Sequence, residues 1–373
     1  MQKCDKISIM EDEIKTIEDL GYDDFFESNR VKLGLASFDV ARVITEHKGI
    51  YRVKDIEGEY SAKIKGKQIF EAMSREDFPA VGDWVSIAKM DSEQAVIQTI
   101  LPRKTLIKRK YNNRDETQII ATNIDTAFIV EAVDRDYNLN RIERYVAIAR
   151  EGKINPVIII NKTDLISPES LALKLAEVEN RLGGVEIIAT SNLNEDGLDL
   201  LKKHIVKRKT YCFLGSSGVG KSSLINKLLG EELIKTENIG LQSGRGKHAT
   251  TTREMYFLKT GGIVIDNPGV REVGMTDTAT GIDESFDDIV GLTKDCKYLD
   301  CTHVHEPDCA VLSALEAGEI DRGKYTNYIN LKREADHFAM TQLEKKERNR
   351  QFGKFIKNAK KSFKKFNFKD FGE

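Results

Sequence analysis

The sequence predicts a multidomain protein with an N-terminal β-barrel, a central α/β domain and a C-terminal, mostly helical region. Two observations lead to this prediction: short alternating strands give way to β/α alternation after residue 103, and a mixed helical segment with clustered cysteines follows after about residue 290. We therefore expect five segments: an N-terminal helical extension (1–35), a β-barrel (36–103), an α/β domain (104–290), a helical region with clustered cysteines (291–335) and a basic helical tail (336–373).

The first two segments differ in their periodicity. The stretch EDEIKTIEDL (11–20) has helical spacing and predicts a helix. Residues 36–103 instead alternate apolar and polar side chains between glycine-containing turns, as in VGDWVSIAK (81–89) and QAVIQTILP (94–102). Several short strands in a segment of this length favour a five-stranded oligonucleotide-binding (OB) barrel. A small barrel without a ligand has the same strand pattern and remains an alternative.

Buried strands and helices alternate in the central domain. Apolar runs of the buried-strand type are DTAFIVEAV (125–133), NPVIII (155–160), EIIATS (186–191), TYCFL (210–214) and GGIVID (261–266). Helices are expected between them, at 139–152 and 222–230. This alternation predicts a mostly parallel sheet covered by helices.

The composition is that of a soluble globular protein, with 32% charged and 40% hydrophobic residues and a net charge of -2. No apolar run approaches the ~20 residues that span a bilayer, and the N-terminus lacks an apolar signal core. We expect a cytoplasmic, monomeric protein without membrane contact. Three of the five cysteines lie between residues 296 and 309, which in a cytosolic chain indicates a metal site rather than disulfides.

The segment GSSGVGKSS has the spacing of a phosphate-binding loop, G-x-x-x-x-G-K-[ST], between an expected strand and an expected helix. Its glycines allow backbone N–H groups to converge on one anion. Lys221 is expected to neutralise the β- and γ-phosphates of a nucleotide, and Ser222 to bind Mg²⁺. The residues of this candidate site are Gly215, Ser216, Ser217, Gly218, Val219, Gly220, Lys221, Ser222 and Ser223.

Two downstream segments complete the phosphate end of the candidate site. Asp266, at the end of an apolar strand, is expected to hold Mg²⁺ through water, and the N–H of Gly269 is expected to reach the γ-phosphate. Residues 240–255 are rich in Gly, Ser and Thr and fit a mobile switch loop, in which Thr250 or Thr251 coordinates Mg²⁺. A plain surface loop is the alternative for this segment.

An N-K-x-D segment, typical of guanine recognition, precedes the phosphate loop in the chain. Its residues are Asn161, Lys162, Thr163 and Asp164. Asp164 can accept hydrogen bonds from guanine N1 and from the 2-amino group, which adenine lacks. Asn161 would hold the loop, and the Lys162 stem would cover the ring face. Ser191 and the backbone beside it could meet guanine O6, so the predicted substrate is GTP rather than ATP.

The motif order is rotated relative to ordinary GTPases, because the base-reading segment comes first, followed by the phosphate loop, the switch and the Mg²⁺ aspartate. Loops at the carboxyl ends of parallel strands converge in space whichever strand comes first. The rotation is therefore compatible with one site, and the sequence predicts a circularly permuted P-loop GTPase domain.

The clustered cysteines have metal-ligand spacing. Cys296, Cys301, His303 and Cys309 form the pattern C-x₄-C-x-H-x₅-C. Three thiolates and one imidazole suit one tetrahedral Zn²⁺ ion, and four protein ligands make such a site structural. His305 is an alternative nitrogen ligand, and reduced cysteines without a metal are the alternative to the whole site.

The C-terminal tail is strongly basic. Residues 341–373 contain eleven Lys or Arg and four Asp or Glu, a net charge of +7, with six interleaved phenylalanines. Such a tail suits contact with RNA phosphates and unstacked bases. An amphipathic helix packed on its own domain is the alternative.

These motifs, in this order, resemble the circularly permuted ribosome-assembly GTPases RsgA, also called YjeQ or YloQ. The resemblance covers nearly the whole chain and rests on NKTD, GSSGVGKSS, GRGKHATTT, DNPGVRE and the cysteine spacing. It implies late maturation of the small ribosomal subunit, contact with its rRNA, and GTPase activity that the subunit stimulates. It also implies that the zinc ligands, without His305, are Cys296, Cys301, His303 and Cys309.

Two positions depart from the family pattern. Ala249 replaces the first Thr of H-T-T-T, and Asn192 stands where the family often has Ala. Lys221 is expected to assist catalysis at the phosphates. Because Val270, and not Gln, follows the D-x-x-G segment, we hypothesise that His248 orients or activates the attacking water. A His248 that only contacts RNA or solvent is the alternative.

Two other functions share some of these motifs. One is a GTP-regulated RNA-binding or translation-control module, in which hydrolysis is incidental. The other is an ATPase or small-molecule kinase with the same phosphate loop, which the NKTD segment disfavours.

Overall fold

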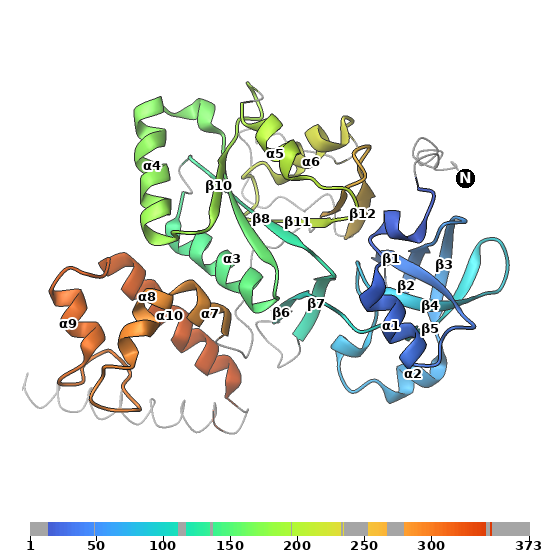
Figure 1. The fold of residues 1–373 in the computed structure, drawn as a ribbon, viewed down its shortest axis with the longest axis horizontal. Helices are drawn as coiled ribbons and strands as arrows, with labels where there is room; N and C mark the ends of the chain where they lie inside the picture. The colour runs from blue at the N-terminus through green and yellow to red at the C-terminus, as the bar shows by residue number, and fades with distance from the viewer. Residues whose placement is uncertain are drawn as a thin grey trace, which may run out of the picture.

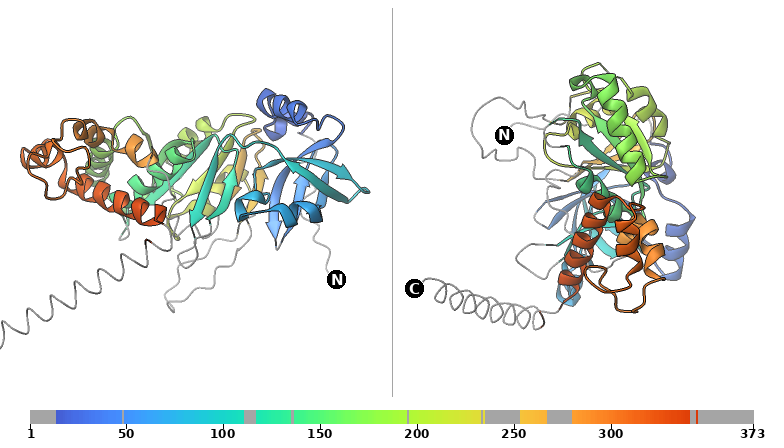
Figure 2. Two further views of the ribbon diagram at one scale, coloured as in Figure 1. Left: turned by 90° about the horizontal axis from the view of Figure 1, so that it is seen from below. Right: turned by 90° about the vertical axis from the view of Figure 1, so that its left-hand side faces the viewer.

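The protein is described from a computed structural model that covers residues 14–47, 49–110, 117–134, 137–194, 196–232, 234, 253–266, 280–340 and 344. The barrel, the central α/β domain and the C-terminal helices follow one another along the long axis of the molecule (Figures 1 and 2). No helix among the described residues is long and apolar enough to cross a bilayer. Most of the basic tail lies outside the described residues, as do His248, Thr250, Thr251 and Gly269.

Five strands close the N-terminal barrel. They are β1 (Asp39–His47), β2 (Ile50–Lys54), β3 (Glu59–Ile64), β4 (Trp84–Lys89) and β5 (Gln94–Ile100), with α2 (Gly66–Glu71) and the 3₁₀ turn η2 (Arg75–Asp77) between β3 and β4. β1 pairs with β2 and β4, β2 with β3, β3 in parallel with β5, and β5 with β4. Side chains such as Val43, Val53 and Ile97 form its core. The predicted OB barrel is confirmed.

The N-terminal extension contains a helix, but not where the sequence spacing placed it. The helix is α1 (Asp24–Lys32), and the described part of 11–20 forms only a 3₁₀ turn, η1 (Ile17–Leu20). The α-helix predicted over 11–20 is therefore wrong in its described part. The Asp19 carboxylate binds two backbone N–H groups at the start of the turn, and Gly21, at φ 88°, ends it after four residues.

The central sheet has the strand order β10-β9-β8-β11-β13-β12 (Figure 1). Its strands are β8 (Thr126–Ala132), β9 (Asn155–Asn161), β10 (Glu186–Ala189), β11 (Thr210–Leu214), β12 (Glu254–Phe257) and β13 (Ile263–Asp266). All neighbours are parallel except β12 and β13, which confirms the predicted mostly parallel sheet. The connecting helices are η3 (Thr163–Leu165), α3 (Leu139–Glu151), α4 (Pro168–Arg181), α5 (Leu198–His204) and α6 (Lys221–Leu229).

Two further connections tie the barrel to this sheet. A hairpin that the sequence analysis did not predict, β6 (Leu106–Lys110) with β7 (Thr117–Thr122), links the two domains along the chain. β1 also pairs with β12, where Thr45 lies opposite Glu254. The barrel and the central sheet are therefore joined at a strand edge as well as by the chain.

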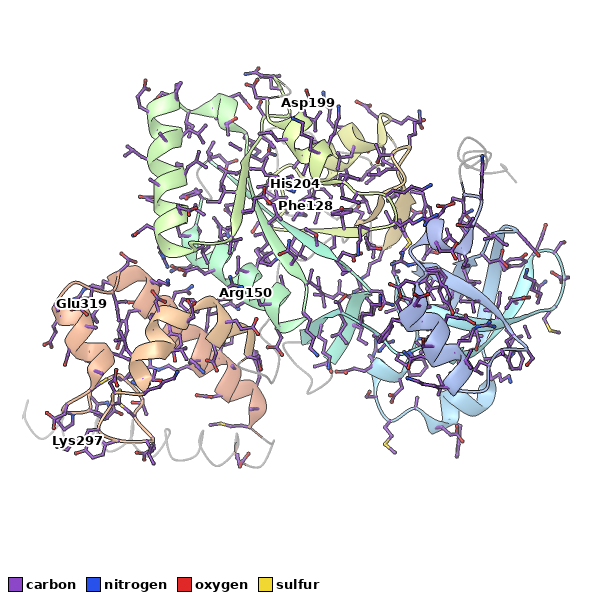
Figure 3. The ribbon with its side chains drawn as sticks, viewed as in Figure 1. Phe128, Arg150, Asp199, His204, Lys297 and Glu319 are labelled. Carbon is purple, nitrogen blue, oxygen red and sulfur yellow. The ribbon has the colours of Figure 1, made fainter. Side chains whose placement is uncertain are left out.

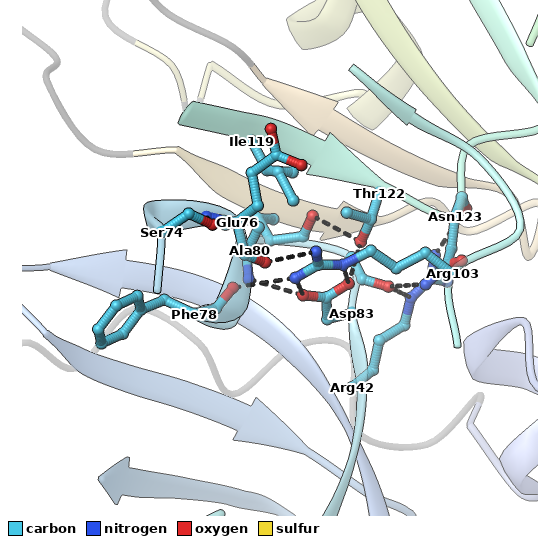
Figure 4. A network of polar contacts seen from close by, with 12 residues as sticks. Arg42, Ser74, Glu76, Phe78, Ala80, Asp83, Arg103, Ile119, Thr122 and Asn123 are labelled. Atoms are coloured by element: carbon cyan, nitrogen blue, oxygen red, sulfur yellow. Dashed lines mark hydrogen bonds and ion pairs between the residues drawn. The ribbon is translucent and has the colours of Figure 1, made fainter. Parts of the chain in front are cut away.

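Buried polar contacts fix the barrel on the strand that precedes the phosphate loop, and Figure 4 shows the part of this network in which Arg42 approaches Asn123. The Arg42 guanidinium of β1, 1% exposed, donates to Thr210 Oγ1 at 2.8 Å and to the carbonyl oxygens of Leu20 and Asn123. Burial lowers the pKa of Arg42 to about 10. Because Thr210 begins β11, one side chain connects the extension, the barrel and the central sheet.

The described C-terminal helices are α7 (Thr280–Ser285), α8 (Asp287–Thr293), α9 (Ala310–Glu316) and α10 (Arg322–Ala339). Of these, α7 and α10 pack on α3, and α8 lies against α7 and α9. The segment boundaries expected at 290/291 and 335/336 fall inside α8 and α10. The fully buried Glu143 carboxylate of α3 receives Arg181 at 2.8 and 2.6 Å and Asn327 at 2.5 Å. Arg150, labelled in Figure 3, lies at the far end of α3. It donates to the carbonyl oxygen of Glu284 at 2.6 Å.

Candidate functional site

The predicted phosphate loop lies between β11 and the N-terminus of α6. Gly215, Gly218 and Gly220 have φ angles of 146°, 82° and 101°, a backbone conformation that residues other than glycine rarely adopt. A Cβ at Gly215 would lie 2.2 Å from the carbonyl oxygen of Val130. The glycines of the motif are therefore required by the backbone itself, and Ser217 and Gly218 at the tip face solvent.

Lys221 folds back over this loop. Its Nζ donates to the carbonyl oxygens of Gly215 at 2.8 Å and Ser216 at 2.6 Å. Ser222 and Ser223 follow in the half-buried first turn of α6. The ammonium group and the N-terminus of α6 thus place positive charge at one end of the loop, as a bound phosphate requires.

The N-K-x-D segment contacts the phosphate loop directly. The Asn161 amide, fully buried at the end of β9, donates to the carbonyl oxygen of Val219 at 2.8 Å and accepts from Thr190 Oγ1 at 3.0 Å. Lys162 has a left-handed backbone, φ 63°, and its Nζ lies 2.6 Å from Asp134 Oδ2. The segment and the loop, 58 positions apart in the sequence at this bond, therefore meet at one edge of the sheet.

Asp164 is oriented by the next loop along this edge. The Ser191 hydroxyl, which is buried, donates to Asp164 Oδ1 at 2.5 Å. The backbone N–H and the hydroxyl of Thr163 both reach the carbonyl oxygen of Thr190 at 3.2 Å. The two loops are thus locked together, with the Asp164 carboxylate half-buried between them.

Asp266 ends β13, the strand beside β11, and is 5% exposed. Burial raises the pKa of its carboxyl to about 6. Lys221 opposes this rise by attraction, whereas Glu254, directly across the strand pair, adds to it by repulsion. A buried carboxylate beside the phosphate loop has the donor chemistry that Mg²⁺ prefers.

Sequence reasoning missed several side chains at this edge of the sheet. Arg141 of α3 donates to Ser216 Oγ at 2.6 Å, and Asp134 pairs with Lys162. Asn192 has a buried Oδ1 without a hydrogen-bond partner among the described residues, and its Nδ2 lies beside Gly220. Thr190 and Asn192, which flank Ser191, could have been found from the sequence, but Arg141 and Asp134 belong to no motif.

The predicted zinc ligands come together in space. The ligand atoms of Cys296, Cys301, His303 and Cys309 lie within 4.8 Å of one another. The sulfurs of Cys296 and Cys309 are 3.9 Å apart, and each is 3.5 Å from His303 Nδ1. Tetrahedral Zn²⁺ with Zn–S bonds of about 2.3 Å separates two sulfurs by roughly 3.8 Å, so this donor set fits the ion.

The loop that carries these ligands is held by its neighbours. The Tyr325 hydroxyl of α10 donates to the carbonyl oxygen of His303 at 2.6 Å. The Glu306 carboxylate accepts the Thr302 hydroxyl and the backbone N–H groups of Thr302 and His305, and these bonds lower its pKa, the hydroxyl bond most of all. Among the described residues, His303 belongs to the cluster of potential ligands and His305 does not.

Known proteins are similar to this chain in sequence and in fold. The family model of the RsgA GTPase matches residues 100–276. "Small ribosomal subunit biogenesis GTPase RsgA 2" of Lactiplantibacillus plantarum is 40% identical over 84% of this chain and 89% of that protein. RsgA 1 of Bacteroides thetaiotaomicron is 37% identical over 86% of this chain and 90% of that protein. The structure of YjeQ from Thermotoga maritima is 28% identical, with a TM-score of 0.59 over 79% of this chain and 98% of that one. YloQ, described as a circularly permuted GTPase, shares the fold at 23% identity, with a TM-score of 0.58 over 80% and 95% of the two chains.

Proposed function

This chain belongs to the RsgA GTPase family and is a GTP hydrolase, and we propose that it acts on the small ribosomal subunit late in its assembly. The relatives are named as small ribosomal subunit biogenesis GTPases, which supports this role. In this proposal the cytoplasmic, monomeric protein hydrolyses GTP to GDP and phosphate, and the subunit stimulates the reaction.

One contact carries the assignment of the nucleotide site. The 2.8 Å bond from Asn161 to Val219 joins the N-K-x-D segment to the phosphate loop, which supports a single nucleotide site built from both. A base held by Asp164 would therefore have its phosphates within reach of Lys221. Against ATP the Asp164 carboxylate would face no 2-amino donor, and an unpaired polar group of this kind disfavours the wrong nucleotide strongly.

The residues at the phosphate end have separate roles in this proposal. The loop N–H groups and Lys221 hold the β- and γ-phosphates, and Ser222 and Asp266 hold Mg²⁺. Mg²⁺, when bound, neutralises charge on the phosphate oxygens. His248 of the switch orients the attacking water, and either Thr250 or Thr251 completes the Mg²⁺ ligands.

The zinc site is structural in this proposal. Three thiolates and one imidazole would occupy all four coordination positions of a tetrahedral ion, so no position remains for a substrate. Cys309 precedes α9, and His303 is tied to α10, so the ion would hold the loop of residues 296–309 against both helices. We propose that this region, the barrel and the basic tail bind rRNA. Phe70 and Met73, between β3 and β4 of the barrel, are apolar side chains that are almost fully exposed, which favours a partner-binding surface there.

GTP hydrolysis with and without purified small ribosomal subunits tests the proposal. We expect slow turnover by the protein alone and a sharp increase with subunits, but not with an equal mass of free RNA. Equal stimulation by free RNA would favour a GTP-regulated RNA-binding module, and no stimulation by either would refute a subunit-dependent GTPase. Turnover by the His248→Ala variant at saturating subunits, if equal to wild type, would remove His248 from the mechanism.

A further inference from the structure

Arg141 lies beside the phosphate loop but belongs to none of its motifs. It occupies the first turn of α3, where Asn138 caps the helix. Its Nη1 donates to Ser216 Oγ at 2.6 Å, and its Nε lies 3.6 Å from Glu131 Oε2. Glu131 is fully buried near the carboxyl end of β8, the strand beside β11. One guanidinium group therefore connects the loop to the neighbouring strand.

Ser216 connects the phosphate loop to Lys221 and to α3. Its main-chain oxygen accepts the Lys221 ammonium at 2.6 Å. Its side chain also hydrogen bonds with Tyr145, one turn further along α3. The preceding Gly215 backbone lies against Val130 of β8. The start of the loop is thus fixed by α3 and β8, while its tip remains open to solvent.

We propose that Arg141 is a positioning residue for the phosphate loop, which it holds through Ser216 in the conformation that receives nucleotide phosphates. This inference rests on the proposed nucleotide site. A hydrogen bond from a charged donor is stronger than a neutral one, and the planar guanidinium, restrained by Glu131, fixes its direction. Because the bond forms before the nucleotide binds, it lowers the cost of ordering the loop in the ground state and in the transition state alike.

Arg141→Met, Ser216→Ala and the double variant test this role by steady-state GTP hydrolysis and by binding of fluorescent GDP. We expect Arg141→Met to raise KM and the GDP dissociation constant about tenfold, the size of one charge-assisted bond, with kcat changed less than about threefold. Arg141→Lys should recover part of the affinity. The double variant should bind no more weakly than the weaker single variant, because both substitutions remove the same bond.

Arg144→Met is the matched control. Arg144 lies on the same helix but forms a bidentate pair with Glu334 of α10, at 2.6 Å for each bond, so its loss should leave KM unchanged. Independent, multiplying effects of Arg141→Met and Ser216→Ala would overturn the inference, as would a wild-type KM in Arg141→Met. Lys221→Ala distinguishes a failure of the proposed nucleotide site from a failure of the role of Arg141. If Lys221→Ala abolishes nucleotide binding while Arg141→Met leaves binding unchanged, only the role of Arg141 is refuted. Normal binding by Lys221→Ala would instead refute the proposed site.

Discussion

Replacing Asp266 by Asn is expected to stabilise the free protein at pH 8, although it removes a carboxylate that is proposed to hold Mg²⁺ through water. The carboxyl group is 5% exposed at the end of β13, and burial raises its pKa from 3.8 to about 6. The nearby Lys221 opposes this rise but does not cancel it. The ionised carboxylate therefore destabilises the folded protein, because its charge is buried. Asn has nearly the same shape and no charge, so it would remove this cost.

The size and sign of the effect follow from the pKa. The unfolded chain releases this proton near pH 3.8 and the folded protein near pH 6, so the folded state binds more protons between these values. Stability therefore falls as pH rises through this window. At 1.36 kcal/mol per pKa unit, the destabilisation above pH 6 is about 3 kcal/mol, and it vanishes below the unfolded pKa.

Chemical denaturation of wild type and Asp266→Asn, without nucleotide or Mg²⁺, measures this difference. We expect the variant to be more stable by up to about 3 kcal/mol at pH 8, and the two proteins to converge near pH 4. A variant that is equally stable or less stable at pH 8 would refute the reasoning. So would a difference that does not depend on pH, because it would not arise from ionisation of this carboxyl group.

Three further predictions concern the same edge of the sheet and the C-terminal helices. In wild type, the Mg²⁺ affinity of the GDP complex should fall about tenfold per pH unit below pH 6, as protons compete for Asp266, and a Mg²⁺ titration of Asp266→Asn should lack this dependence. Arg181→Met should destabilise the protein by about 3–5 kcal/mol in urea denaturation, because the Glu143 carboxylate stays buried without its cation, and Glu143→Gln should recover part of the loss. Metal analysis should find one Zn²⁺ per chain, and a strong chelator should lower the unfolding temperature of wild type but not of Cys301→Ala.

Features that depend on local spacing could be predicted from the sequence. The phosphate loop needs positive φ at Gly218 and Gly220, and the glycines at those positions of the motif predict the loop from the sequence. The cysteine cluster lies within fourteen residues, from Cys296 to Cys309, so its spacing alone brings the ligands together. Five strands of the central sheet, β8, β9, β10, β11 and β13, were predicted because each is a short apolar run, and all of them but β10 are mostly buried. The sixth, β12, is only partly buried and was not predicted: it begins at Glu254, inside the segment 240–255 that was expected to be a loop.

Features that depend on distant contacts could not be predicted in this way. Arg141 and Ser216 are 75 positions apart, and Glu143 and Asn327 are 184 apart, so no spacing rule connects them. The described part of 11–20, residues 14–20, lacks the predicted α-helix for a different reason. Its apolar spacing suits a helix, but the Asp19 carboxylate caps the start of a 3₁₀ turn, and Gly21, at φ 88°, ends that turn after Leu20.

Selectivity of the nucleotide site tests most directly whether the base-reading segment and the phosphate loop form one pocket. Fluorescent GDP bound to the protein is displaced with GDP, ADP or XDP, in wild type and in Asp164→Asn. We predict that ADP binds wild type roughly 10⁴-fold more weakly than GDP, and that Asp164→Asn prefers XDP, because its amide can donate to the 2-oxo group. Displacement by ADP as effective as by GDP would contradict the shared pocket.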